Sequence, residues 1–225
     1  LKINLVSEPI NPNDRLARIN SILTSGDKSI DILSINDEML AEFRKTDFLE
    51  PLQNTVMTKN VIQQFSASYI QNMCECKGNI FSVPQHTEVL GLWVNQEKLK
   101  AIGMKQIRTK TDFMKYISSY SIGGKYGYGG AWDKTYAFNE IGTFVNLFGG
   151  NYYDWKNPKS REAVEFLHDM VKNKQTPVTQ TADQYDSMLQ KFMDGDYGSV
   201  LMWSSITQEL IDSGKYGPDK LHMVA

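Results

Sequence analysis

Short apolar runs and segments with helical spacing of apolar positions alternate along the whole chain. The runs that predict strands are Ile3–Val6, Ile30–Ile35, Ile80–Val94, Tyr126–Tyr128, Ser199–Trp203 and Leu221–Ala225. The segments that predict helices are Asn13–Thr24, Met39–Phe43, Val56–Gln71, Gln96–Ile102, Thr111–Tyr120, Lys134–Phe148, Arg161–Asn173, Asp183–Met193 and Ser205–Gly214. Strands that alternate with helices in this way are typical of α/β folds with mostly parallel sheets and crossover helices.

Residues with defined roles at helix ends support several of these boundaries. Asn11-Pro12 and Asn157-Pro158 each precede a predicted helix, because proline is tolerated in the first helical turn. Gly26 follows the first helix, where a left-handed residue commonly ends it. Ser205 and Gln208 have the spacing of a capping box at the start of the last helix.

The elements divide the chain into two lobes. Residues 1–88 predict a first lobe of βαβα type, and residues 89–98 predict a hinge crossover. Residues 99–225 predict a second, helix-rich lobe. Pro84 interrupts the extended segment before the crossover, which agrees with a change of direction there.

The charge of the chain argues against a nucleic acid or an anionic membrane surface as partner. Lys and Arg number 24 against 26 for Asp and Glu, so the net charge is −2. A surface that neutralises phosphates needs a clear excess of positive charge. With 41% hydrophobic and 22% charged residues the composition is that of a folded globular chain, and no apolar run approaches the roughly 18 residues of a membrane-spanning helix.

Cysteine and histidine do not predict a metal site or a redox centre. Cys74 and Cys76 are separated by one residue, which is neither a zinc spacing nor a redox Cys-x-x-Cys, so two loop thiols or a small strained disulfide are the open alternatives. His86, His168 and His222 are far apart in the sequence. We therefore expect no metal and no cofactor.

Catalytic and nucleotide-binding motifs are absent from the sequence. The glycine-rich segment 123–130 lacks the features of a phosphate-binding loop and predicts a flexible turn around Tyr128. The carboxylates of Asp37, Glu38 and Glu88 could form the pair that a glycosidase needs. Acidic residues behind a strand are more often helix caps, so no catalytic residue is assigned.

Ligand binding is the better use of these polar groups, because ligands of open α/β sheets lie beyond the carboxyl ends of the strands. Three such ends carry polar or aromatic clusters, at 36–38, 85–88 and 203–205. Carboxylates and amides hydrogen-bond to hydroxyl groups, and aromatic faces cover apolar faces of sugar rings. The candidate ligand-binding residues from this pattern are Asn36, Asp37, Glu38, His86, Glu88, Trp132, Trp203 and Ser204.

Four stretches of the chain resemble the extracellular solute-binding proteins, family 1, of ABC importers, a maltose-binding-protein-like and mostly carbohydrate-binding group. They are Ser25–Asp27 with Ile30–Leu33 and Phe48–Leu52; Ile80–Pro84 with Leu92–Leu99, Gly103 and Thr111–Phe113; Gly149–Asp154 with Ser160–Leu167; and Phe192–Gly198 before the strand to Trp203. In the last stretch Gly198 and Ser199 replace the pair of small residues that is usual in the family. The likeness extends over nearly the whole chain.

The resemblance implies a type II periplasmic-binding-protein-like fold whose two lobes close on a ligand. It implies that the first strand and helix of lobe 1 precede Leu1, and that the chain stops before it returns to that lobe. A signal or lipoprotein leader, a position at the outer face of the membrane or in the periplasm, and docking of a monomer onto a membrane permease are also implied. By position it adds Tyr136 and Asn139 to the ligand-facing residues and supports Glu88 and Trp203.

The function expected from residues and resemblance together is binding of a sugar or oligosaccharide for an ABC importer, without chemistry. A binding protein for a cationic ligand such as a polyamine is the main alternative, because carboxylates neutralise ammonium groups and tryptophan stacks on them. A glycoside-processing enzyme that uses the same carboxylates is the remote alternative. The identity of the sugar does not follow from the sequence.

Overall fold

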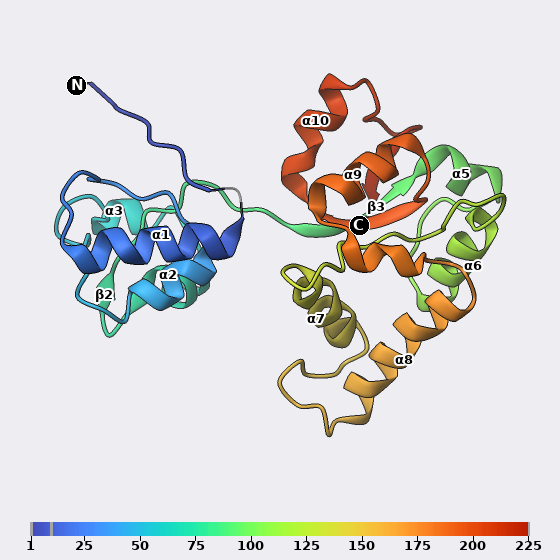
Figure 1. Ribbon diagram of the computed structural model, residues 1–225, viewed down its shortest axis with the longest axis horizontal. Coiled ribbons are helices and arrows are strands. Elements are labelled where there is room, and N and C mark those ends of the chain that lie inside the picture. Colours follow the sequence, from blue (N-terminus) through green and yellow to red (C-terminus); the bar gives the residue numbers. More distant parts are fainter. Residues whose placement is uncertain (1, 10, 225) are drawn as a thin grey trace. The chain divides into compact units, whose positions relative to one another are not determined.

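The computed structural model of the chain describes residues 2–9 and 11–224, which form two compact units (Figure 1). Unit 1 comprises Leu1–Thr87 and unit 2 comprises Glu88–Ala225. Unit 2 therefore begins at residue 88, and the expected crossover at 89–98 is occupied by a strand and the start of a helix of this unit. Ala225, expected in the last strand, lies outside the described residues.

Unit 1 is built around two helices with the capping that the sequence predicts. Helix α1 spans Pro12–Ser25; the side chain of Asn11 accepts hydrogen bonds from the first turn, and Gly26 ends the helix with φ 68°. Helix α2 spans Asp37–Phe43 and begins at the cap Asn36. The two helices pack through a small core cluster that contains Ile19, Met39 and Phe43.

The rest of unit 1 consists of short elements. Helices α3 (Lys59–Ile62) and α4 (Ala67–Tyr69) and a π-helical turn (Ile70–Cys74) replace the single longer helix expected over Val56–Gln71. Strands β1 (Glu75–Cys76) and β2 (Asn79–Ile80) then form an antiparallel hairpin. Both cysteines, Cys74 and Cys76, are free thiols.

Two predicted strands of unit 1, Ile3–Val6 and Ile30–Ile35, are not strands in the structure. Leu33 and Ile35 pack against the α1–α2 core. Leu5 and Ile32 are 92% and 87% exposed, respectively. A strand is defined by hydrogen bonds to a neighbour, and within the described residues neither segment has a ladder partner. Their apolar pattern was correct for extended chain, but the prediction of a sheet was wrong.

Unit 2 is organised by a three-stranded sheet of order β4-β3-β5. The central strand β3 (Leu90–Asn95) pairs with β4 (Ser199–Trp203) and with β5 (Leu221–Val224). Both ladders are antiparallel, with Leu90 opposite Trp203 and Asn95 opposite Leu221. The expectation of mostly parallel pairing is therefore corrected: among the described residues of unit 2, parallel pairing occurs as isolated bridges only.

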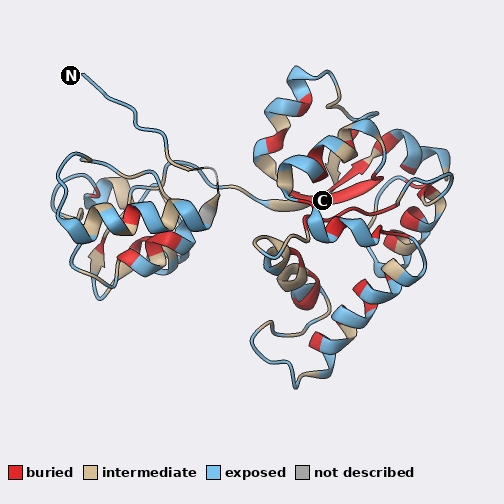
Figure 2. Cartoon of the chain, viewed as in Figure 1, coloured by how far each residue is buried: buried red, intermediate tan, exposed pale blue. Residues whose placement is uncertain are grey.

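Helices cover both faces of this sheet, which confirms the α/β class. They are α5 (Gln96–Ala101), α6 (Lys110–Tyr120), α7 (Ala137–Leu147), α8 (Pro158–Lys172), α9 (Tyr185–Asp194) and α10 (Thr207–Asp212), with 3-10 turns at Val178–Ala182 and Ser204–Ile206. Neighbouring residues of β3 point to opposite faces of the sheet and enter different cores. Val94 belongs to the cluster around α6, α7 and α8, and Trp93 belongs to the cluster around α9 and α10. Figure 2 shows these buried strands between exposed outer helix faces.

Residues 127–130 of the glycine-rich segment are buried chain beside β4, so the predicted flexible turn around Tyr128 was wrong; the turn lies earlier, at the exposed Gly123 and Gly124. Tyr128 is fully buried, and parallel bridges join Tyr126 to Tyr197 and Gly129 to Val200. A Cβ on Gly129 would lie 1.8 Å from the Tyr197 ring. Glycine is needed here for close approach of two chain segments rather than for mobility.

Candidate functional site

Three segments of unit 2 reach the same edge of its sheet. Segment 126–130 runs parallel to β4, with Gly129 opposite Val200. Trp132 and Trp203 each follow this pair by three residues, so both lie where the two segments end. Because β3 is antiparallel to β4 and Leu90 pairs with Trp203, Glu88 comes to this edge as well. We call this group of residues the sheet-edge site.

Hydrogen bonds join the start of β3 to the end of β4 at this site. The backbone N–H of Ser204 donates to the carbonyl of Val89 at 2.9 Å, and the N–H of Val89 donates to Ser204 Oγ at 3.1 Å. Ser205 Oγ donates to Glu88 Oε2 at 2.8 Å. Ser204 therefore fixes the backbone, and Ser205 orients the carboxylate of Glu88 beside the half-buried Trp203.

The last helix starts later than the sequence predicts. Residues Ser204–Ile206 form a 3-10 turn, and α10 begins only at Thr207. The side chain of Gln208 donates to Asp212 instead of reaching back to Ser205. The predicted capping box is absent because Ser205 lies inside the 3-10 turn and the residue before α10 is Ile206.

A pair of tyrosines lies at the starts of α7 and α9. The rings of Tyr136 and Tyr185 lie 4.9 Å apart between centroids, tilted by 58°, and both pack against the core that contains Met202. Asn139 Nδ2 donates to the hydroxyl of Tyr185 at 3.1 Å. Sequence reasoning missed Tyr185, because its spacing on α9 matches the apolar face and assigned it to the core.

Glu140 is the most unusual residue near the site, and sequence reasoning missed it too. It is 1% exposed and accepts hydrogen bonds from the N–H of Ala131 at 2.6 Å and from Trp132 Nε1 at 3.1 Å. The hydroxyl of Tyr128 donates to the same carboxyl group. Burial disfavours the charged carboxylate and raises the pKa of Glu140 to about 7, although these three hydrogen bonds act in the opposite direction. Its signal in the sequence was an acidic residue on the apolar face of α7.

The backbone around Glu140 leaves no room for a larger residue. A Cβ on Gly130 would lie 2.4 Å from Trp132 Nε1 and 2.6 Å from a Glu140 oxygen. The N–H of Gly130 donates to the buried Gln180 at 2.8 Å. The indole of Trp132 is thereby held in a fixed position by a buried carboxyl group.

Four predicted site residues belong to unit 1. Asn36 caps α2, and its side chain accepts from the N–H of Met39 at 3.1 Å. Asp37 and Glu38 are exposed in the first turn of that helix, and His86 is exposed near the end of the unit. Desolvation and the charge of Asp37 raise the pKa of Glu38. The remaining six predicted residues, Glu88, Trp132, Tyr136, Asn139, Trp203 and Ser204, lie in unit 2.

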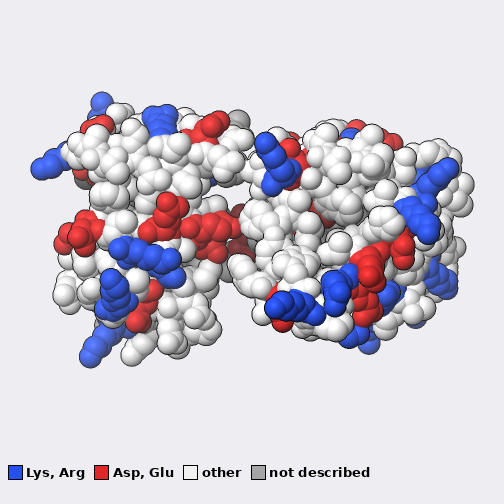
Figure 3. Space-filling model, turned by 60° about the horizontal axis from the view of Figure 1, so that its bottom comes forward, with Lys and Arg blue, Asp and Glu red and all other residues white. Residues whose placement is uncertain are grey.

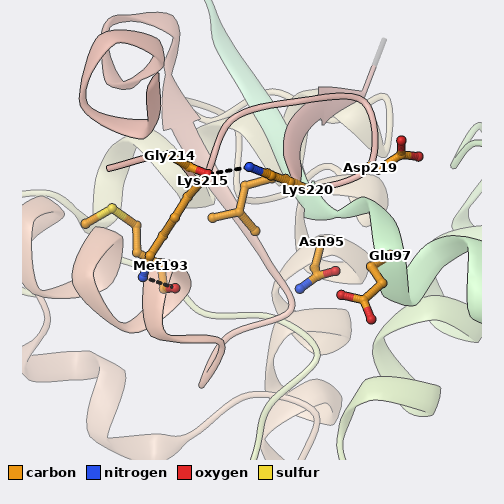
Figure 4. Close-up of a pocket in the computed structure, with 8 residues that line it drawn as sticks. Asn95, Glu97, Met193, Gly214, Lys215, Asp219 and Lys220 are labelled. Atoms are coloured by element: carbon orange, nitrogen blue, oxygen red, sulfur yellow. Dashed lines mark hydrogen bonds between the residues drawn. The ribbon is translucent and has the colours of Figure 1, made fainter. Parts of the chain in front are cut away.

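A shallow hollow of unit 2 is bordered by lysines that hydrogen-bond to the chain itself. It has a volume of about 230 Å³ and is lined by residues of β3, α5, α9 and the chain before β5, including Asn95 and Glu97 (Figure 4). Lys215 Nζ donates to the carbonyl of Met193 at 2.6 Å, and Lys220 Nζ donates to that of Gly214 at 2.7 Å. Its lysines therefore serve the fold.

The distribution of charged side chains on the surface agrees with the small net charge of the chain (Figure 3). On the face drawn in Figure 3, basic and acidic side chains are interspersed on each unit. Among residues 2–9 and 11–224, no three His, Cys, Asp or Glu side chains are grouped so that they could hold a metal ion. In the same residues no helix has both the length and the apolar character to cross a membrane.

Comparison with known proteins shows what the chain is similar to. Residues 1–225 match the family model of the bacterial extracellular solute-binding proteins. No curated protein matches the chain. Among solved structures, maltose-bound MalE3 of T. maritima superposes with a TM-score of 0.81 at 20% identity, over 97% of this chain and 57% of that one.

Two further structures show the same fold. RafE in complex with raffinose has a TM-score of 0.72 at 16% identity, over 97% of this chain and 58% of its own. A solute-binding protein of Agrobacterium vitis with bound D-mannitol has a TM-score of 0.75 at 13% identity, over 92% of this chain and 53% of its own. The chain thus spans little more than half the length of these proteins. Because the family model matches the chain from end to end, this protein belongs to the bacterial extracellular solute-binding proteins.

Proposed function

We propose that the chain is the ligand-binding part of a receptor that binds a sugar or oligosaccharide outside the cell and delivers it to the permease of an ABC importer. The observation that supports this proposal most is the sheet-edge site, where Ser205 orients the carboxylate of Glu88 beside the half-buried Trp203; we assign Trp132 and the pair of Tyr136 and Tyr185 to the same site. The similar structures with bound maltose, raffinose and mannitol support a polyhydroxylated ligand.

Each residue of the site has a distinct role in this proposal. The indole faces of Trp132 and Trp203 stack on the apolar faces of sugar rings. The carboxylate of Glu88, oriented by Ser205, accepts hydrogen bonds from sugar hydroxyl groups. Tyr136 and Tyr185 form an aromatic wall whose hydroxyl groups are further partners for the ligand. Asn139 positions the Tyr185 ring.

The four candidates of unit 1 remain proposals of their own. Asp37, Glu38 and His86 are exposed and offer hydrogen-bonding groups to a ligand, while the side chain of Asn36 is used by the cap of α2. Their substitution tests them independently of unit 2. An effect of Asp37→Asn or His86→Ala on sugar affinity, with unchanged thermal stability, would add them to the site.

Location and partner follow from the family. An extracellular solute-binding protein acts in the periplasm or at the outer face of the cell membrane. We propose that a lipid anchor or the periplasmic space retains the receptor there and that it docks as a monomer onto its permease. Uptake of labelled sugar by cells that carry or lack this chain tests delivery. The mechanism is binding and release, with no bond of the ligand broken.

The test is isothermal titration of the full chain with maltose, raffinose, mannitol and spermidine at low and high salt. We expect maltose, raffinose or mannitol to bind with an affinity that does not depend on salt, because the hydroxyl groups of these ligands carry no charge. Glu88→Gln and Trp203→Ala should each weaken binding by about 1–3 kcal/mol, while the exposed Glu97→Gln serves as the control. Binding of spermidine alone, with affinity that collapses in salt, would replace the sugar by a cation. Sugar affinity that both variants leave unchanged would refute the sheet-edge site.

A further inference from the structure

Three aromatic side chains lie together on the loop that joins α7 to α8, far from the sheet-edge site along α7. Tyr152 contacts both Tyr153 and Trp155, each edge-to-face at 5.5 Å between ring centroids. Tyr153 is 90% exposed and Trp155 is 46% exposed. Figure 2 shows this loop, yellow-orange in Figure 1, as exposed chain. The eleven residues of α7 separate it from the start of that helix by roughly 16 Å.

The loop is internally braced, so the rings are held in place without being buried. Ser160 is fully buried, and its hydroxyl donates to the carbonyl of Asn151 at 2.9 Å and accepts from the Asn151 N–H at 3.1 Å. The side chain of Asn151 accepts from the N–H of Tyr153 at 2.9 Å. Tyr152 packs against the large core of unit 2 and anchors both exposed rings. Exposed aromatics on such a rigid support are pre-organised for binding.

A shallow, largely apolar hollow lies beside Trp155, with Arg161 and Glu165 among the residues that line it. Its volume is about 290 Å³, and Arg161, Val164 and Glu165 of α8 complete its wall. This volume is close to the lower end of small-molecule sites. Arg161 and Glu165 are both exposed, and each offers a planar group able to make two hydrogen bonds to neighbouring hydroxyls. The indole face can stack on the apolar face of a sugar ring, while the planar polar groups can hydrogen-bond to its hydroxyl groups.

The size of this surface favours a sugar over a protein partner. A stable protein interface buries about 800 Å² on each side and has an apolar centre. Here the exposed rings belong to one short loop, and two of the four residues that line the small hollow beside it, Arg161 and Glu165, are charged. We propose that Tyr153, Trp155, Arg161 and Glu165 form a second carbohydrate site, which binds a neutral glycan chain on the outside of unit 2.

The second site is independent of the first in its residues. None of its four side chains contributes to the sheet-edge site: they lie on the loop before α8 and on α8 itself, whereas Glu88 and Trp203 lie at the start of β3 and the end of β4. A receptor with both sites holds one stretch of a long glycan on its surface while a short product enters the other site. The two proposals can therefore fail separately, and the test distinguishes them.

The test is native gel electrophoresis of the full chain in gels that contain starch or laminarin, with titration of maltoheptaose in solution. We expect a polysaccharide to retard the protein. Trp155→Ala should weaken that interaction about ten-fold, the loss of one stacking contact, and Trp155→Phe should retain most of it. Val178→Ala, which changes an exposed apolar side chain outside both proposed sites, should leave retardation unchanged. Circular dichroism of each variant checks that the exposed loop tolerates the change.

Four results would overturn the proposal. Absence of retardation of the wild-type chain by both polymers would do so, as would retardation that Trp155→Ala and Glu165→Ala leave intact. A concentration-dependent dimer in sedimentation that Tyr153→Ala abolishes would assign the surface to self-association. Retardation lost in Trp203→Ala but kept in Trp155→Ala would support the sheet-edge site and remove the second one.

Discussion

The sequences of units 1 and 2 show a similar alternation of apolar runs and helical segments, but the two units differ in the extent of their sheets and in the size of their cores. In unit 2, β3 lies between two partners and alternate side chains enter two large cores. In unit 1 the described ladder is the two-residue pair of β1 and β2, and the cores are small. Leu5 and Ile32 remain exposed there. Apolar alternation thus describes a segment able to enter a sheet, whereas the sheet itself depends on a partner strand.

The units also differ in what they bury. Among the residues that the structure describes, the buried polar and charged side chains all lie in unit 2: Gln96, Glu140, Ser160, Gln175, Thr176, Gln180, Asp183 and Ser199. Buried polar groups require specific partners, so unit 2 has a core with defined geometry. Unit 1 is held chiefly by small apolar clusters and helix caps.

The largest expected effect comes from equal truncations in the two cores. Leu99 of unit 2 and Ile19 of unit 1 are both fully buried. Leu99→Ala should lower the free energy of unfolding of unit 2 by about 3–5 kcal/mol, because the large surrounding core cannot collapse into the cavity. Ile19→Ala should cost about 2 kcal/mol, since a small cluster relaxes more easily. Hydrogen exchange in urea, resolved for each unit, measures both; equal losses would contradict the contrast.

A pH dependence should distinguish unit 2. The folded pKa of Glu140 is about 7, above its ordinary value of 4.5, so the folded state holds the proton more tightly. The contribution of Glu140 to stability is therefore greatest below pH 4.5 and falls as the pH rises to about 7, by about 3 kcal/mol. Urea unfolding between pH 4.5 and 8 measures the slope.

The matched variants make that slope specific. Glu140→Gln should flatten it, because the amide does not titrate. Glu162→Gln should leave it in place, since Glu162 is partly exposed on α8 and Lys159 holds its pKa below the ordinary value. A slope that persists unchanged in Glu140→Gln would mean that another group titrates in this range.

A third comparison concerns the polar clusters of the two units. Asp183 of unit 2 is buried and accepts from the hydroxyl of Tyr197 and from Lys191 Nζ, both at 2.6 Å. Asp183→Ala should cost about 2–3 kcal/mol, because the Tyr197 hydroxyl is left buried without its acceptor.

The counterpart in unit 1 is Arg44, which donates to the carbonyls of Asn72, Met73 and Glu75 at 2.9–3.2 Å. Arg44→Ala should cost only about 1 kcal/mol, because water reaches these carbonyls when the side chain is removed. Chemical denaturation of each variant measures the difference. A larger loss in Arg44→Ala than in Asp183→Ala would contradict the proposed contrast in burial.

The smallest effect should be equal in the two units. Asn11 and Asn157 each cap a helix that continues with proline, and each accepts a 2.9 Å bond from the backbone N–H two residues ahead. Asn11→Ala and Asn157→Ala should each cost about 1 kcal/mol, because the same local bond is lost. Thermal unfolding followed by circular dichroism measures both. A clear inequality would show that tertiary packing, and not the cap, holds one of these helices.

Much of the fold could be predicted because its signals are local. Apolar spacing together with Asn caps and terminal glycines predicted α1, α6, α7, α8 and α9 to within about three residues at each end. Strand β4 was predicted with its observed bounds. The resemblance to solute-binding proteins, confirmed by the family match, rested on the order of such local motifs.

The candidate site was predictable only in part. Trp132 and Trp203 were found from their residue type and neighbours, and the register of unit 2 brings them to one edge. Tyr185 was assigned to the core, because a helix period does not distinguish a buried face from one that borders a site. Glu140 was overlooked, although an acidic residue on an apolar helix face indicates a buried, hydrogen-bonded carboxyl group.

The sequence alone determined the α/β class, the helix ends and the residue types available for binding, because these depend on neighbours within a few positions. Tertiary structure decided which extended segments pair, in which direction, and which side chains meet. Ile30–Ile35 remains without a ladder in the described residues, Ser205 binds Glu88 rather than capping its helix, and Gly129 admits the Tyr197 ring. Each outcome depends on a contact with a residue distant in the sequence, which no local pattern encodes.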